Sequence, residues 1–282
     1  MAFVSVFNDV LGPVMRGPSS SHTAGAWRIG RMVRSLLGSG PAAARVTFDP
    51  GGSYAPTYIP LGVDLAFTAG VMGWSMLDER YFEALERAAG EDVEIAFAVA
   101  PLEHTDHPNG ARIEVEAGDG RRLEAVAEAG GGGVIRFVRV EGWPVELDGK
   151  SHEVLVEARS AAAADVATRL EEGAALLAPL ERLEREGSTL LRAQCARALA
   201  PDARHAVESL EGVDRLWASE PVFHVRGGET LFESGADMLD LAEARGLSLG
   251  GVTLAYESEI LGLPETEVLE ETLRRLEVME SS

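Results

Sequence analysis

Residues 17–30 read GPSSSHTAGAWRIG, and they open the most regular pattern in the chain. From about His22 to Leu37 the apolar residues recur at three- and four-residue spacing, which predicts a helix with one buried face. Serines often cap a helix start, and we expect the backbone N–H groups of the first turn to point outward without partners. Such a helix terminus favours an anion, for example a carboxylate or a phosphate.

His22 adds a side chain that titrates near neutral pH and can act as an acid, a base or a hydrogen-bond donor. A simple helix cap with a surface histidine accounts for the same residues without any ligand. From the motif alone, both interpretations stay open.

The chain around this helix predicts an α+β protein in three parts. Residues 1–150 mix helices with strands, and the short connections between the later strands favour antiparallel pairing. Residues 151–226 follow the order strand–helix–strand–strand–helix–strand, which is that of the ferredoxin-like motif, although generic α+β packing is an alternative. Residues 227–282 predict three helices that dock on something else.

Composition excludes several classes of protein. A net charge of −21 argues against a nucleic-acid surface, because phosphate binding needs clustered cations. No stretch approaches the ~20 apolar residues that a membrane span needs, and the N-terminus lacks the pattern of a signal peptide. We therefore expect neither a nucleic-acid nor a membrane partner, and a cytoplasmic location.

The numbers of lysines and cysteines limit which cofactors this chain can hold. Lys150 is the single lysine and lies in a predicted turn, which disfavours a pyridoxal-phosphate enzyme. Cys195 is the single cysteine, so this chain alone cannot hold an iron–sulfur cluster, which needs several thiolates. His104 and His107 form only a weak metal-binding signal, and we predict no metal site. The glycines at 130–133 lack the pattern of a nucleotide loop and indicate close backbone approach instead.

Several motifs closely resemble the β chain of bacterial iron–sulfur L-serine dehydratases. The segments that carry the resemblance are residues 5–15, GPSSSHTAGAWRIG at 17–30, GSYAPT at 52–57, HPN at 107–109, and the glycine run before Val134. On this resemblance, residues 1–150 are a serine dehydratase β-type (allosteric substrate binding) domain. Residues 151–226 resemble that family's ACT regulatory domain, and residues 227–282 resemble the helical start of the cluster-bearing α chain.

The resemblance implies one component of a two-part lyase, inactive alone, that converts L-serine to pyruvate and ammonia. In that family a [4Fe–4S] cluster, held by the α part, coordinates the substrate as a Lewis acid. His22 is then the candidate catalytic residue. The candidate substrate-binding residues are Ser19, Ser20, Ser21, Thr23, His107 and Asn109. Pairing of ACT-like sheets across subunits further implies a homodimer.

One position departs from the family pattern. Where family members usually carry Gly-His-Gly-Thr-Asp, this chain has PLGVD at residues 60–64. Leu61 can neither transfer a proton nor donate a hydrogen bond. A second hypothesis is therefore a non-catalytic, amino-acid-sensing regulatory module of the same family. A third is a scaffold for an α chain, suggested by the helical C-terminal part.

Overall fold

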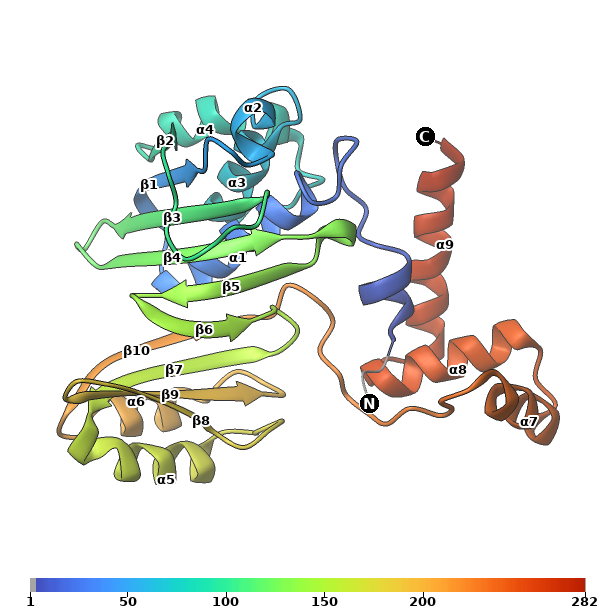
Figure 1. Ribbon diagram of the computed structural model, residues 1–282. Coiled ribbons are helices and arrows are strands. Elements are labelled where there is room, and N and C mark those ends of the chain that lie inside the picture. The colour runs from blue at the N-terminus through green and yellow to red at the C-terminus, as the bar shows by residue number, and fades with distance from the viewer. Residues whose placement is uncertain (1–3, 282) are drawn as a thin grey trace. The chain divides into compact units, whose positions relative to one another are not determined.

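The computed structural model describes residues 4–281, so the ends of the predicted parts at residues 1–3 and 282 lie outside it (Figure 1). Its residues form two compact units. The larger unit runs from Met15 to Val222. The smaller unit joins the N-terminal residues up to Val14 with the residues from Phe223 onward. The model thus confirms a mixed α+β protein with two sheets.

The larger unit contains a six-stranded sheet in the order β2-β1-β3-β4-β5-β6. Its strands are β1 (Pro41–Phe48), β2 (Glu94–Val99), β3 (Gly110–Ala117), β4 (Arg122–Ala129), β5 (Ile135–Val140) and β6 (Trp143–Leu147). Consecutive strands from β3 to β6 pair antiparallel, as predicted from their short connections. β2 instead pairs in parallel with β1, because the helices between these two strands carry the chain back before β2 begins.

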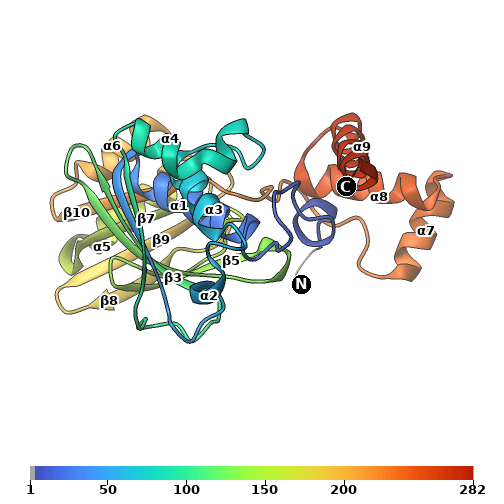
Figure 2. The ribbon, with the colours of Figure 1, turned by 90° about the horizontal axis from the view of Figure 1, so that it is seen from above.

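Two helices cover one face of this sheet, α1 (Ala24–Leu37) and α3 (Val63–Met72) (Figures 1 and 2). The predicted helix at 22–37 is confirmed and begins two residues later than expected. Its apolar stripe is fully buried, as at Ile29 and Val33. The shorter helices of this part are α2 (Tyr54–Thr57) and α4 (Ala84–Gly90).

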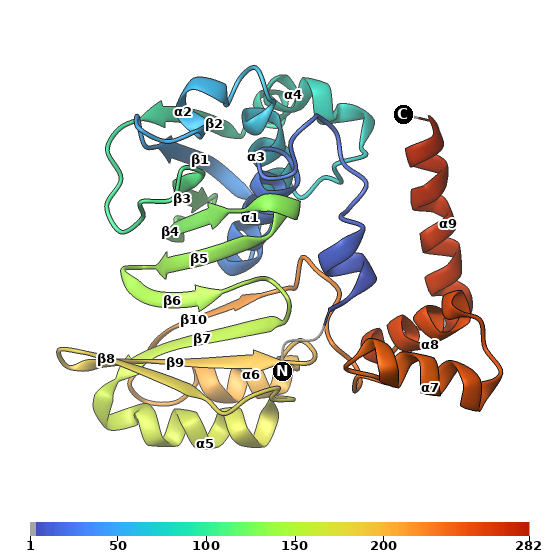
Figure 3. The ribbon, with the colours of Figure 1, turned by 45° about the vertical axis from the view of Figure 1, so that its right-hand side comes forward.

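A second, four-stranded sheet completes the larger unit, in the order β10-β7-β9-β8. Its elements are β7 (His152–Arg159), α5 (Ala163–Gly173), β8 (Glu181–Arg185), β9 (Ser188–Cys195), α6 (Pro201–Glu208) and β10 (Val213–Ser219). This is the predicted strand–helix–strand–strand–helix–strand order. Both helices lie on one face (Figure 3), where Val154, Val156 and Leu170 form the core. On the strands of this sheet, Glu153 and Arg192 form a buried ion pair at 2.8 Å.

The smaller unit contains the three predicted C-terminal helices. They are α7 (Gly235–Arg245), α8 (Leu249–Leu261) and α9 (Glu265–Ser281). A short π-helical turn at Val6–Val10 lies beside α9 (Figures 1 and 3). None of the helices in the described residues is long and apolar enough to cross a membrane.

Two buried charged side chains hold the N-terminal segment in the smaller unit. The Glu257 carboxylate, 1% exposed, accepts hydrogen bonds from the Ser5 hydroxyl at 2.6 Å and from two backbone N–H groups at 2.8 and 3.0 Å. Arg275 donates to the carbonyl oxygens of residues 7, 11 and 12 and stacks over the ring of Phe7. Hydrogen bonds in which the donor or the acceptor is ionised are stronger than those between neutral groups. The contacts of Glu257 and Arg275 therefore order residues 5–12.

We expect Glu257→Gln to loosen this segment selectively. Loss of the charge weakens bonds that each contribute about 1.5–3 kcal/mol when an ionised group is involved. Hydrogen exchange at the amides of Val6 and Phe7 should therefore accelerate at least about tenfold. Glu259→Gln, on the exposed side of the same helix, is the matched control and should leave these rates unchanged. Equal exchange in both variants would show that Glu257 does not hold the segment.

Candidate functional site

The residues before α1 form a turn of their own. The backbone N–H groups of His22 and Thr23 donate to the Ser19 carbonyl oxygen at 3.1 and 3.0 Å, and that of Gly25 donates to Ser20 at 2.9 Å. Thr23, the residue at the N-cap position, makes no side-chain capping bond. The expectation that a serine side chain caps α1 is therefore wrong. Of the first-turn N–H groups, that of Gly25 has an acceptor in the preceding turn, whereas those of Ala24 and Ala26 have none among the described residues, as expected.

The serine hydroxyls contact the imidazole of His22 instead. Ser19 Oγ lies 2.9 Å and Ser21 Oγ 3.1 Å from His22 Nδ1, while Ser53 Oγ lies 3.3 Å from Nε2. Tyr54 meets the ring edge-on, with the ring centroids 5.2 Å apart. We call these five residues the His22 cluster. Hydrogen bonds at both nitrogens fix the orientation of the imidazole.

Burial sets the charge of this cluster. His22 is 7% exposed, and burial lowers its pKa below the ordinary value of 6.5. The ring is therefore neutral at neutral pH, with one nitrogen donating and the other accepting, and hydroxyls can complement either tautomer. Burial also raises the pKa of Tyr54, whose hydroxyl donates to the Ser21 carbonyl oxygen at 2.8 Å.

The predicted hydroxyl residues play different parts in the structure. Ser19 and Ser21 are half-buried and bind His22. Ser20 is also half-buried, and its hydroxyl makes no hydrogen bond to any residue that the structure describes. Thr23 is 1% exposed and donates to the Ser19 carbonyl oxygen at 2.8 Å. Ser20 is thus the hydroxyl that remains open to a ligand, whereas Thr23 holds the turn.

The structure also brings the distant motifs together around this turn. The Ser53 N–H donates to the Pro108 carbonyl oxygen at 2.6 Å, which places the 107–109 loop against the 52–57 motif. The glycine run packs on the start of α1, where a Cβ atom added at Gly133 would lie 2.8 Å from Ala24 Cβ and 3.3 Å from the Ser20 carbonyl oxygen. Segments that lie far apart in sequence therefore meet at one place.

His107 and Asn109 lie in the adjoining loop rather than in the His22 cluster. His107 Nδ1 accepts a hydrogen bond from the Asn109 backbone at 3.1 Å, and the Asn109 amide donates to Ala129 at 3.0 Å. Asn109 Oδ1 is buried and has no hydrogen-bond partner in the described part of the chain. These contacts make both residues supports for the loop, with one acceptor oxygen still unused.

Sequence reasoning assigned no role to Ser53 and Tyr54. Both lie within the GSYAPT motif at 52–57, which carries part of the family resemblance. Their polar side chains within that motif were the signal that could have identified them. Leu61, which departs from the family pattern, borders the same region, since a Cβ atom at Gly17 would lie 3.7 Å from the Leu61 carbonyl oxygen.

The side chains present do not fit an iron–sulfur cluster. Cys195 is fully buried, and burial, with a smaller contribution from Glu153, raises the pKa of its thiol to about 11. A cluster needs thiolates, and this thiol stays protonated at neutral pH. Within residues 4–281, no three histidine, cysteine or acidic side chains are grouped to hold a metal ion.

The fold and the His22 cluster define a mixed α+β protein whose candidate site combines hydroxyl groups with one neutral imidazole. No family model matches the chain. It is 41% identical over 156 residues to the probable L-serine dehydratase β chain of Bacillus subtilis (strain 168), covering 55% of this chain and 69% of that protein. It is 32% identical over 149 residues to the L-serine dehydratase β chain of Peptoniphilus asaccharolyticus, covering 53% and 66%. The chain belongs to the L-serine dehydratase β-chain family.

The lowered pKa of His22 leads to a test by titration. As the pH falls through 6.5, the unfolded chain takes up a proton on this residue that the folded chain does not, so His22 reduces stability on the acid side. We expect the His22 ring signals in NMR spectra to titrate with a midpoint below 6.5. A midpoint above that value would mean that the imidazole is not enclosed in a neutral state.

Proposed function

We propose that this chain is the β component of an L-serine dehydratase, a lyase that converts L-serine to pyruvate and ammonia together with a separate α part. The observation that carries the proposal is the His22 cluster, where two of the segments that resemble the family, 17–30 and 52–57, meet at one buried imidazole. The names of the two relatives support the reaction and imply an α partner.

The [4Fe–4S] cluster of the proposed enzyme belongs to the α part, since this chain's residues do not fit it. This chain contributes polar side chains that are held in fixed positions. The Ser20 hydroxyl is free to donate to a substrate carboxylate. His22, neutral and held at both nitrogens, is a group that can accept a proton.

The resemblance to the family extends the proposal to the other parts of the chain. Residues 151–226 would act as an ACT-like regulatory domain, and residues 227–282 would correspond to the helical start of an α chain. The active form would be a cytoplasmic assembly that contains a homodimer of this chain.

A non-catalytic, amino-acid-sensing module is the second candidate function. Leu61 favours it, because an apolar side chain replaces the histidine that the family pattern carries. The enclosure of His22 favours it as well, since both ring nitrogens already have hydrogen-bond partners within the chain. In such a module the hydroxyl groups would bind an amino acid without catalysing a reaction.

The leading proposal predicts that His22→Ala lowers turnover at least about tenfold, as removal of a group engaged in proton transfer does. The measurement is pyruvate formed from L-serine by the chain and its α partner, reconstituted without oxygen. His205→Ala, on the exposed surface of α6, is the control and should keep full activity. Circular dichroism must show that both variants fold. Unchanged turnover in His22→Ala would remove His22 from the site.

A second substitution separates the two candidate functions. If the chain has become a sensor through loss of the family histidine, the unaltered pair is inactive and Leu61→His restores at least some pyruvate formation. If the chain is a working β component, the unaltered pair is already active without this change. Calorimetry with L-serine on the chain alone completes the comparison: serine binding without activity from the unaltered pair supports the sensor.

A further inference from the structure

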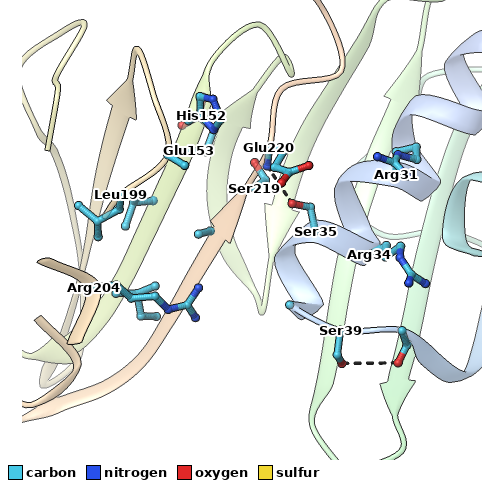
Figure 4. A pocket seen from close by; sticks show the side chains of 16 residues that line it. Arg31, Arg34, Ser35, Ser39, His152, Glu153, Leu199, Arg204, Ser219 and Glu220 are labelled. Atoms are coloured by element: carbon cyan, nitrogen blue, oxygen red, sulfur yellow. Dashed lines mark hydrogen bonds between the residues drawn. The ribbon is translucent and has the colours of Figure 1, made fainter. Parts of the chain in front are cut away.

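A cavity of about 400 Å³ lies within the larger unit (Figure 4), and no residue of the His22 cluster lines it. One wall comes from α1 and the turn that follows it, with Arg31, Arg34 and Ser35. The opposite wall comes from β7, β10 and α6, with His152, Ser219 and Arg204. The cavity therefore lies between α1 and the second sheet with its helix α6. Its size is typical of a small-molecule site.

The α1 wall carries two arginines that form no ion pair in the described part of the chain. Among the described residues, Arg31 and Arg34 form no ion pair, although the chain has 46 acidic and only 25 basic residues. Their guanidinium groups donate to the carbonyl oxygens of Gly73 at 2.8 Å and Val71 at 3.0 Å. Burial, and then the charge of Arg31, lowers the pKa of Arg34, while the charge of Glu91 acts in the opposite direction. Two arginines held side by side in this way attract an anion.

The opposite wall contains a polar group without a partner. Ser219 is 3% exposed, and its hydroxyl oxygen is buried without a hydrogen bond to any described residue. Buried hydroxyls are nearly always hydrogen-bonded, so such an atom on a cavity wall indicates an absent partner. Next to it, the Glu220 N–H donates to Ser35 Oγ at 2.8 Å and joins the two walls.

The carboxylates on the lining do not cancel this charge. Glu153 is fully buried, and both of its oxygens accept hydrogen bonds from Arg192. Glu220 is exposed at the rim, where its charge acts on His152. Arg204, 40% exposed, pairs with Glu208 on its own helix and lies across the cavity from the α1 arginines. The interior of the cavity is therefore cationic on balance.

We propose that this cavity binds a small organic anion through a phosphate or carboxylate group. Arg31 and Arg34 supply the charge, Arg204 supplies a guanidinium donor whose charge is shared with Glu208, and Ser219 supplies one hydrogen bond. A guanidinium group matches both kinds of oxyanion, so the recognised chemistry is shared between them. The volume exceeds that of a bare oxyanion and leaves room for a carbon skeleton against Val154, Leu199 and Leu216. Binding here would bridge α1 and the second sheet, and it requires neither an α partner nor turnover.

The test is calorimetric titration of the full chain at constant ionic strength. Glycerol 3-phosphate and malonate are the two anionic probes, and glycerol is the neutral control. Arg204→Gln should weaken binding about tenfold, because it removes one charged donor. Arg169→Gln is its matched control, since Arg169 is a similarly exposed arginine on α5 that pairs with a glutamate of its own helix. Ser219→Ala removes only a hydroxyl without a partner and should weaken binding roughly threefold without harming the fold.

The outcomes separate clearly. Binding of either probe at one site, weakened in Arg204→Gln and Ser219→Ala but not in Arg169→Gln, supports the proposal. Glycerol 3-phosphate alone would identify a phosphate ligand, and malonate alone a carboxylate. No binding of either probe, or equal binding by all variants, would overturn it. The result is independent of the proposed dehydratase function, because no step of the assay uses serine or an α partner.

Discussion

The close crossing of α1 and α3 is the constraint on which the rest of the larger unit depends. A Cβ atom at Gly70 would lie 2.3 Å from the Trp27 carbonyl oxygen, and one at Gly30 would lie 2.8 Å from that of Phe67. Only glycine at both positions lets the two backbones approach this closely. The start of α1 is tightly packed in the same way, since a Cβ atom at Gly25 would lie 2.6 Å from Ala129 Cβ. With α1 fixed on two sides, the turn before it can hold His22 against Ser53 and Tyr54.

Local sequence patterns, each confined to a few neighbouring residues, predicted much of the fold. Periodicity gave α1 to within two residues and the three C-terminal helices, and the alternation of short segments gave the element order of the second sheet. The parallel pairing of β1 with β2 was missed, because it depends on how several helices return the chain. Glu257 was missed as well, since nothing local marks a glutamate that binds backbone groups some 250 residues away.

The sequence singled out residues of the candidate site but did not predict their geometry. The motif identified His22 and its serines, yet a helix cap and a histidine-binding turn use the same residue types. The difference lies in Thr23, whose backbone is helical although it stands at the N-cap position. The turn that begins at Ser19 therefore runs directly into the helix, and the serine side chains face the imidazole instead of capping. Ser53 contributes from 31 residues further along, a distance over which sequence spacing carries no information on contact.

Enclosure gives the His22 cluster a definite chemical character. Because burial keeps the imidazole neutral and hydroxyls hold both nitrogens, the ring is oriented before any ligand arrives. A preorganised neutral group needs little reorganisation when it exchanges a proton, whereas a solvated histidine must first lose water. Ser20, half-buried in the same turn, keeps a hydroxyl that makes no hydrogen bond to any described residue. A cluster of this kind is suited to bind and orient a small polar molecule.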